Sequence, residues 1–482
     1  MHFFKRSTFL AALAAFGSSS LTPLDCNLQI QTSSGVLNGF INPPTPDVRQ
    51  FLGVPFSLPP TGNRRWLPPS KLESTCQVAA TNIGPACPQL LLADSAFPFN
   101  TSVYSPLGGN QTEYFPLDDF SEDCLTLNIW TPRNATGNLP VIVWFFGGGF
   151  TQGGTNSLYF NPESWVQRTQ QHIVVTVNFR SNIFGFPNAA GLSEQNLGLL
   201  DQRLALEWTR ENIARFGGNS SQIVDWGESA GATAVDYLDF AYPTDPIVSG
   251  KIMDSTTALF PSTFTDTNQT FFATVGMAFN CTSVDCLRNV SWQSIEAYLS
   301  KHATLQFLQF PAVPDERIVF SNYTPRYAAG AFSSVPAIIL NNQYELNALN
   351  YTEEQKQTGD KSFCISSAAA SQFREAQNRT TYRFYNTGNF SNLSPPDYTG
   401  AYHASELPLI MGTAGKYHGA STEFEDLVSE KLQDLWLDFA RDPESGLRKA
   451  GWGSYKDGKA LLIGEGNVAV QEMEISALDG AC

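Results

Sequence analysis

A serine placed between a predicted strand and a predicted helix is the feature that most constrains this chain. Residues 222–226 form an apolar strand pattern, Gly227-Glu228-Ser229-Ala230-Gly231 follows directly, and a run compatible with a helix comes next. So abrupt a turn strains the backbone at the serine and pushes its hydroxyl out above the sheet, and only small neighbours avoid a collision. The five-residue pattern alone is weak, because chance would supply about 0.2 copies in this composition. The interpretation of Ser229 as a nucleophile therefore needs support from elsewhere in the chain.

A glycine-rich loop upstream of the serine gives that support. Residues 139–146 predict a buried strand, and Gly147-Gly148-Gly149 follows it. Glycines let backbone N–H groups turn toward a ligand, and acyl transfer needs such preplaced donors for the oxyanion of its tetrahedral intermediate. Alone, the loop could equally be a flexible turn. Its position before the serine favours the catalytic interpretation, so we predict an oxyanion hole formed by the N–H groups of Gly148, Gly149 and Ala230.

Several longer segments resemble one known family. Residues 198–208, residues 212–219 and the serine turn are together similar to the type-B carboxylesterase/lipase family, which includes fungal secreted lipases and the cholinesterases. Residues 51–56 and 122–128 are further matches, and the likeness covers most of the chain. The resemblance implies an α/β-hydrolase fold, with a mostly parallel central sheet covered by helices on both faces, and a serine esterase activity.

The pattern of strands and helices predicts the same class of fold. Strand-like runs alternate with helix-like runs, which indicates a parallel sheet covered on both faces. We expect a helix at about 196–216 and a terminal helix capped by Ser421 or Thr422. Further strands are expected at 126–130, 172–179, 335–340 and 382–385, with an antiparallel meander over 28–41 and 48–56. We predict one α/β-hydrolase domain over residues 21–482, behind a signal peptide at 1–20 with cleavage between 17 and 22.

A serine nucleophile needs a base, and the base needs an orienting acid. In this fold the acid and then the histidine follow the serine. Among the downstream histidines, His403 lies in a segment that resembles the family's histidine loop, His418 is the second candidate, and His302 precedes the candidate acid. Glu345 resembles the family's acid, although a solvated loop glutamate is the alternative. We predict that Ser229, His403 and Glu345 form the catalytic triad.

Two departures from the family accompany Glu345. The next residue is Leu346, where the family often has glycine. Only 58 residues separate Glu345 from His403, fewer than in the family, so we expect the helices on one side of the active-site gorge to be truncated.

Other charged residues are interpreted as structural. Glu122 and Arg180 match a family pair that forms a buried salt bridge. Asp201 and Arg203 are expected to tie the helix at 196–216 to the sheet. The side chain of Glu228 is expected to point back into the core.

The chain also carries the signs of a secreted protein. A short basic segment, an apolar run at 9–16 and small residues resemble an export signal, and no later segment has the roughly 18 apolar residues of a membrane span. Twelve Asn-X-Ser/Thr sequons and eight cysteines agree with secretion. The resemblance implies Cys87–Cys124 and Cys281–Cys286 disulfides, while Cys26, Cys76, Cys364 and Cys482 allow three pairings. No cysteine or histidine cluster indicates a metal, and no cofactor is expected.

The net charge and one long loop limit the kinds of partner that we expect for this chain. The net charge of −16, without a basic cluster, argues against nucleic acid. A small-molecule or lipid ester is the expected partner, and the oligomeric state stays open. The loop between Cys87 and Cys124 resembles a lipase lid and lacks the tryptophan of choline-selective members; an ordinary glycosylated surface loop is the alternative.

The sequence thus predicts a secreted serine carboxylic ester hydrolase. A lipase acting at an interface and a non-catalytic binding protein on the same fold are the alternatives.

Overall fold

The computed structural model describes residues 28–89, 120–262, 264–302, 310–348, 351–394, 399–417, 419–480 and 482. The predicted signal peptide, His418 and residues 90–119 of the predicted lid between Cys87 and Cys124 lie outside the described residues.

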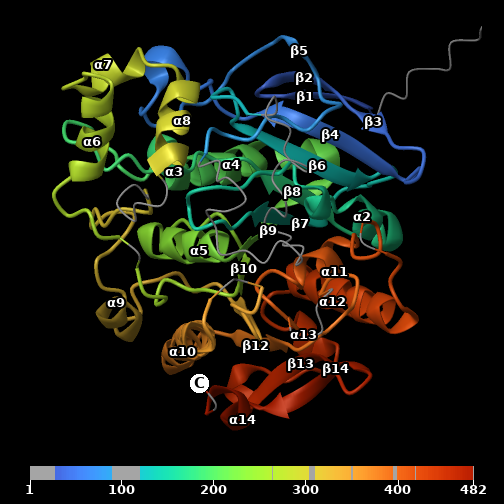
Figure 1. Ribbon diagram of the computed structural model, residues 1–482. Coiled ribbons are helices and arrows are strands. Elements are labelled where there is room, and N and C mark those ends of the chain that lie inside the picture. The colour runs from blue at the N-terminus through green and yellow to red at the C-terminus, as the bar shows by residue number, and fades with distance from the viewer. Residues whose placement is uncertain are drawn as a thin grey trace, which may run out of the picture.

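A large twisted sheet forms the centre of the molecule (Figure 1). Within the described residues it has eleven strands, and those from β8 to β13 run parallel while the strands beyond them are antiparallel. In spatial order they are β14 (Val468–Glu474), β13 (Lys459–Glu465), β12 (Thr381–Asn386), β11 (Ala337–Asn342), β10 (Gly250–Asp254), β9 (Gly218–Glu228), β7 (Leu139–Phe145), β8 (Ile173–Val177), β6 (Thr126–Pro132), β4 (Val48–Pro55) and β3 (Phe40–Ile41). A small second sheet contains β1 (Gln29–Thr32), β2 (Gly35–Asn38) and β5 (Gln77–Ala79).

Helices cover both faces of the large sheet, so the predicted mostly parallel α/β-hydrolase architecture is confirmed. In Figure 1, α4, α5 and α10 lie on one side of the sheet and α2, α11 and α12 on the other. The helices are α2 (Glu163–Thr169), α3 (Asn182–Gly185), α4 (Leu197–Asn212), α5 (Ala230–Ala241), α6 (Thr270–Ala278), α7 (Val284–Arg288), α8 (Trp292–His302), α9 (Thr324–Ala328), α10 (Glu353–Ala376), α11 (Leu407–Met411), α12 (Glu423–Arg441), α13 (Gly446–Lys449) and α14 (Ile475–Asp479). None of the described helices is both long and apolar enough to cross a bilayer.

Local sequence explains why the central elements form where they do. The residues of β8 are all buried, as expected of an apolar, β-branched strand with helices on both faces. Helix α12 begins at a capping box in which Thr422 accepts a hydrogen bond from Glu425 N–H, and its apolar stripe is buried. Of the two predicted caps, Thr422 is therefore correct.

The 24-residue helix α10 was not predicted from the sequence. It occupies much of the interval between Glu345 and His403. The Thr352–Gln355 capping box starts it, and Phe363 lies on its buried face. This side of the site is thus a single long helix.

The cysteines form three disulfides within the described residues. Cys87–Cys124 and Cys281–Cys286 are present as the resemblance implied, and Cys364–Cys482 joins α10 to the end of the sequence. Cys76 is exposed and is bonded to no described cysteine. Cys26 lies outside the described residues, so the structure does not show its partner.

The predicted glycosylation sites differ in accessibility. Among the described sequons, Asn392 is 8% exposed and its side-chain amide donates to the carbonyl of Ala414 at 3.1 Å, so the folded chain does not present it to solvent. Asn219 is half-buried. The remaining described sequon asparagines are exposed, at Asn134, Asn268, Asn280, Asn289, Asn322, Asn378 and Asn389.

The expected buried salt bridge between Glu122 and Arg180 is wrong. Arg65 pairs with Glu122 in a two-pronged contact at 2.5 and 2.7 Å, and Arg180 pairs with Asp201 at 2.7 and 2.8 Å. All four side chains are buried or nearly so. Removing one partner of either pair would leave an uncompensated charge, at about 3–5 kcal/mol. The Arg180–Asp201 pair does tie α4 to the segment after β8, as expected for Asp201.

Arg203 has a different role from the one expected. Its guanidinium contacts Glu207 within α4 and Asp245, which lies beyond the end of α5. Arg203 therefore holds α4 to the loop after α5, and among the described residues no ion pair or hydrogen bond of its guanidinium ties the helix to the sheet.

Candidate active site

Ser229 lies at the sharp turn between β9 and α5. Its backbone has φ 54° and ψ −126°, a conformation that costs a residue with a side chain about 1–3 kcal/mol. The Ser229 N–H donates to the carbonyl of Asp254 at 2.9 Å, and the Thr256 hydroxyl donates to the Ser229 carbonyl. A Cβ at Gly227 would lie 2.2 Å from the backbone of Gly231, so neither side of the turn accepts a larger residue without movement. The strained serine predicted from the sequence is present.

The predicted oxyanion donors lie close to this serine. Gly148 and Gly149 follow β7 with positive φ angles of 100° and 64°, which a residue with a side chain rarely adopts. Gly149 and Ala230 line the same pocket as Ser229. The backbone of the two segments is thus arranged beside the candidate nucleophile, where developing negative charge would need donors.

The pocket at Ser229 is lined mainly by rings and small hydroxyl side chains. It contains about 560 Å³ of space not filled by atoms, and its walls include Phe150, Tyr237, Phe260 and Phe363. Thr233 and Thr256, whose hydroxyls lie 2.8 Å apart, form its polar part together with Ser262.

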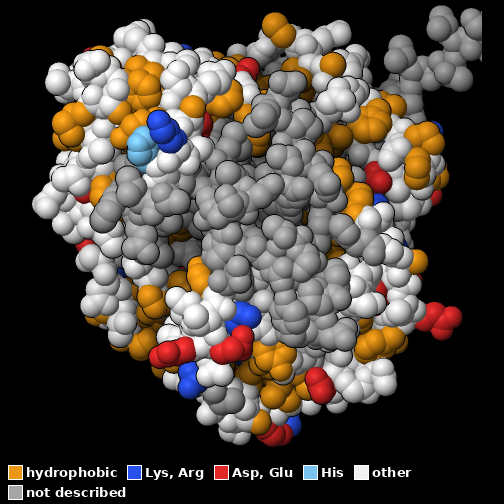
Figure 2. Space-filling view, viewed as in Figure 1, with side chains coloured by type: hydrophobic (Ala, Val, Ile, Leu, Met, Phe, Trp, Pro, Cys, Tyr) orange, Lys and Arg blue, Asp and Glu red, His pale blue; other side chains and the backbone are white. Residues whose placement is uncertain are grey.

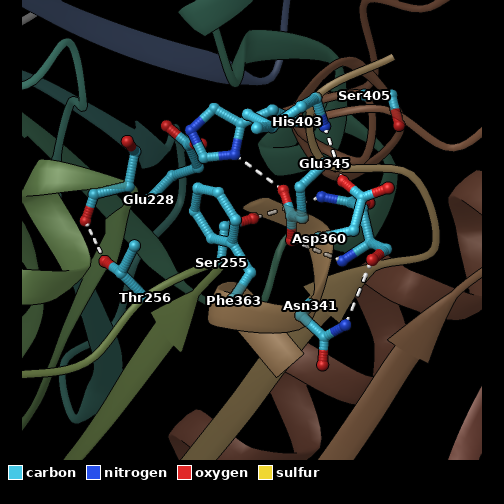
Figure 3. Close-up of polar contacts among 12 residues, drawn as sticks. Glu228, Ser255, Thr256, Asn341, Glu345, Asp360, Phe363, His403 and Ser405 are labelled. Carbon is cyan, nitrogen blue, oxygen red and sulfur yellow. Dashed lines mark hydrogen bonds and ion pairs between the residues drawn. The ribbon is translucent and has the colours of Figure 1, made fainter. Parts of the chain in front are cut away.

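His403 and Glu345 are brought together although 58 residues separate them. His403 Nδ1 lies 2.7 Å from Glu345 Oε2, and the His403 N–H donates to the Glu345 carbonyl at 3.1 Å. The other carboxylate oxygen of Glu345 accepts the Asn342 N–H at 2.7 Å. Glu345 is fully buried, so it is not the solvated loop residue that was the alternative. The ring of Phe363 packs on His403 with a centroid distance of 5.1 Å (Figure 3).

The expectation for Glu228 is wrong in part. The side chain is buried, but its Oε1 lies 3.1 Å from His403 Nε2, so it faces the histidine from the side opposite Glu345 (Figure 3). A Cβ at position 147 would lie 2.5 Å from Glu228 Oε2. Because Gly147 has no Cβ, the Glu228 side chain has room beside the glycine loop and faces His403. Among the described residues, no hydrogen bond joins the side chains of Ser229 and His403. The ring nitrogen that would contact the serine instead contacts Glu228.

These contacts shift the ionisation of both groups. Burial raises the pKa of Glu228 to about 7, against the lowering effect of a charged His403. Burial lowers the pKa of His403, but the carboxylates of Glu228 and Glu345 outweigh it and raise the pKa of the imidazole to about 9. Because the two groups face each other at 3.1 Å, they titrate as a pair.

Two further carboxyl groups lie next to this pair, and the sequence reasoning missed them. Asp254 accepts from the indole N–H of Trp226 at 2.6 Å, and Glu406 accepts from the Asn342 side chain at 2.8 Å. Burial, together with neighbouring carboxylates, raises the pKa of both groups well above the usual range. Strand register could have located Asp254, because it ends β10 directly beside Glu228 at the end of β9.

The remaining histidine candidates lie elsewhere or outside the described chain. His302 ends α8, and its Nδ1 contacts the carbonyl of Tyr298 at 2.7 Å. His418 lies outside the described residues. Ser229 and Glu345 follow the carboxyl ends of β9 and β11, the edge at which open α/β sheets bind their ligands. His403 follows β12 at the same edge. Within the described residues no cluster of side chains could hold a metal ion.

We expect Glu228→Gln to move the acidic limb of the kcat/KM profile to lower pH. Glu228 is one of the carboxylates that raise the pKa of His403, so its neutralisation lowers that pKa and keeps the imidazole neutral, and thus basic, in more acidic solution. The shift should be about one pH unit or more. Rates on a p-nitrophenyl ester from about pH 5 to about pH 10 measure it. An unchanged limb would show that Glu228 does not set the titration of the base.

A serine on such a turn, a glycine loop beside it and this sheet order together define an α/β hydrolase. Comparison with known proteins gives the family: the description "Carboxylesterase family" matches residues 27–379, and the chain belongs to that family. It is 37% identical to a chlorogenic acid esterase of Aspergillus niger, over 99% of this chain and 98% of the relative. It is 36% identical to secreted lipase 5 of Gibberella zeae over 93% and 92%, and 29% identical to a human cocaine esterase over 82% and 79%. The protein is a carboxylic ester hydrolase.

Proposed function

We propose that this protein is a secreted serine esterase that works through an acyl-enzyme intermediate, with Ser229 as nucleophile, His403 as base and Glu345 as orienting acid. The observation that carries the proposal is the strained Ser229 in the wall of a pocket. Another wall residue, Phe363, packs on His403, which is joined to Glu345 at 2.7 Å.

In the first half-reaction, His403 takes the hydroxyl proton as Ser229 Oγ attacks the ester carbonyl. The carbonyl oxygen becomes an oxyanion, which the N–H groups of Gly148, Gly149 and Ala230 stabilise. His403 then gives its proton to the leaving alcohol, and the acyl group stays on Ser229. Water repeats the sequence: it loses a proton to His403 as it attacks the acyl carbon, and His403 then returns a proton to Ser229 Oγ as the bond between Oγ and the acyl carbon breaks and the acid leaves.

The contact between His403 and Glu228 implies a rearrangement in this cycle. His403 Nε2 faces Glu228 in the structure, so the imidazole has to turn toward Ser229 Oγ for proton transfer. Catalytic hydrogen bonds often align only in the complex. Glu228 and Glu345 would then stabilise the imidazolium that forms after proton transfer.

The rings that line the pocket favour an ester with an aromatic or short acyl group. Phe150 and Tyr237 lie parallel, at 6.3 Å between centroids, and Phe260 packs on Phe363 at 4.5 Å, so the acyl group would enter a space bounded by flat surfaces. The identity to a relative named chlorogenic acid esterase supports the same substrate class. We expect hydrolysis of chlorogenic acid and of short p-nitrophenyl esters to exceed hydrolysis of C16 esters by at least about tenfold in kcat/KM. A profile that rises steadily from C2 to C16 would contradict this preference.

A lipase acting on long-chain acylglycerols is the second candidate. A second pocket, also with about 560 Å³ of empty space, shares Tyr237, Phe260 and Ser262 with the first, and a longer acyl chain could extend into it. The similarity to secreted lipase 5 points the same way. Activity that rises sharply above the solubility limit of a triglyceride, and that loses the rise when residues 93–112 are deleted, would favour this candidate.

Secretion is part of the proposal. The disulfides among the described residues, the exposed sequons and a relative named as secreted support it. Protein recovered from the culture medium of a eukaryotic host should begin between residues 17 and 22, whereas an intact Met1 would contradict a cleaved signal.

A further inference from the structure

The turn that carries Glu345 rests against α10. The N–H of Leu346, the residue after Glu345, donates to Asp360 Oδ1 of α10 at 2.9 Å. The Leu346 side chain lies over Gly359 so closely that a Cβ at Gly359 would be 1.9 Å from Leu346 Cδ1. Leu346 is therefore held on the helix by two contacts, one polar and one apolar.

The same helix also reaches the histidine. Phe363, one turn after Asp360, is 7% exposed and packs on the His403 ring, and it also packs on Phe260 of the pocket wall (Figure 3). Consecutive turns of α10 thus contact the His403 ring and the residue that follows Glu345. The outward side of α10 is polar, and charged side chains gather over this helix in Figure 2.

We propose that Asp360 is a positioning residue for the reaction: its carboxylate accepts the Leu346 N–H and thereby fixes the turn that presents Glu345 to His403. The inference rests on the proposed roles of Glu345 and His403. Asp360 touches neither substrate nor the reacting atoms, so it acts through Glu345. The Leu346–Gly359 contact sets the same turn from the apolar side.

The charges around Asp360 make its influence visible in a pH profile. Burial raises the pKa of Asp360 to about 6, the Leu346 N–H opposes the rise, Glu345 and Glu353 add to it, and Lys356 reduces it. Asp360 is in turn one of the carboxylates that raise the pKa of His403, after Glu228 and Glu345. A neutral side chain at this position therefore lowers the pKa of the base.

Two substitutions separate the hydrogen bond from the charge. Asp360→Ala removes the acceptor and should lower kcat by roughly 10- to 100-fold with KM nearly unchanged, because the pocket is untouched while the base is misplaced. Asp360→Asn keeps an acceptor oxygen and should retain kcat within about threefold at pH 8. Its acidic limb should move to lower pH, which a purely structural role would not produce. Glu354→Ala, which removes an exposed carboxylate from the same helix, is the matched control and should match the wild type.

A third variant tests the turn with Asp360 intact. Gly359→Ala favours the helix, so a helix effect alone would leave Tm unchanged or raised. The added Cβ displaces Leu346, and kcat should fall several-fold without loss of Tm. This variant also keeps the proposal testable if Asp360→Ala does not fold.

The inference is overturned if folded Asp360→Ala keeps kcat within twofold of the wild type, if Asp360→Asn loses as much as Asp360→Ala, or if Gly359→Ala is fully active. Labelling of Ser229 by an organophosphate is measured separately in each variant. If Ser229→Ala stays active, the proposed function itself fails, whatever the α10 variants do.

Discussion

Replacing Ser229 with alanine is expected to lower kcat by roughly 10⁴- to 10⁶-fold while leaving a folded protein. In the proposed mechanism the Ser229 hydroxyl forms the acyl bond, and Ser229 lies on a strained turn in the wall of the pocket. Alanine removes one oxygen and should relieve no packing constraint. Initial rates on p-nitrophenyl acetate, corrected for spontaneous hydrolysis, measure the loss.

Covalent labelling provides the control for this result. An organophosphate should label the wild type at Ser229 and should leave Ser229→Ala unlabelled, while circular dichroism shows that both are folded. A variant that retains even a tenth of wild-type activity would remove Ser229 from the mechanism.

Replacing His403 with alanine should be about as damaging as replacing Ser229, because the two groups act as a unit. The double variant should lose little more activity than either single variant, because Ser229 cannot act as a nucleophile without its base. Single and double variants compared on one substrate measure this non-additivity.

The other downstream histidines provide the controls. His302→Ala should stay within a few-fold of the wild type, because His302 contacts the Tyr298 carbonyl at the end of α8. His418→Ala should behave likewise. If His418→Ala were inactive and His403→Ala active, the assignment of the base would be wrong.

The sheet could be predicted from sequence because each of its core strands has a strong local signal. The segments that became β7, β8 and β9 are apolar or β-branched, and glycines or polar residues end them, so their positions did not depend on distant residues. The turn at Ser229 was equally local. The resemblance to the family then supplied Glu345 and His403, which no local pattern distinguishes from other loop residues.

Pairings between distant side chains could not be predicted in the same way. The resemblance paired Glu122 with Arg180, and only the folded chain shows that Arg65 is the partner. The direction of Glu228 depends on the space that Gly147 leaves in another strand's loop. Helix α10 was missed because its long polar segment has a weak apolar stripe, and packing of Phe363 and its neighbours settles its position.

The Cys364–Cys482 disulfide has a practical consequence for anyone preparing this enzyme. It closes a span of 118 residues on the position directly after Phe363, and a cross-link over roughly 100 residues removes unfolded-state entropy worth about 4.7 kcal/mol. A preparation made in a reducing cytosol, or one shortened before Cys482, holds α10 only by its packing and its hydrogen bonds. Weak activity in such material would reflect the loss of this disulfide, and the chemistry of the serine should be judged only on oxidised protein that retains Cys482.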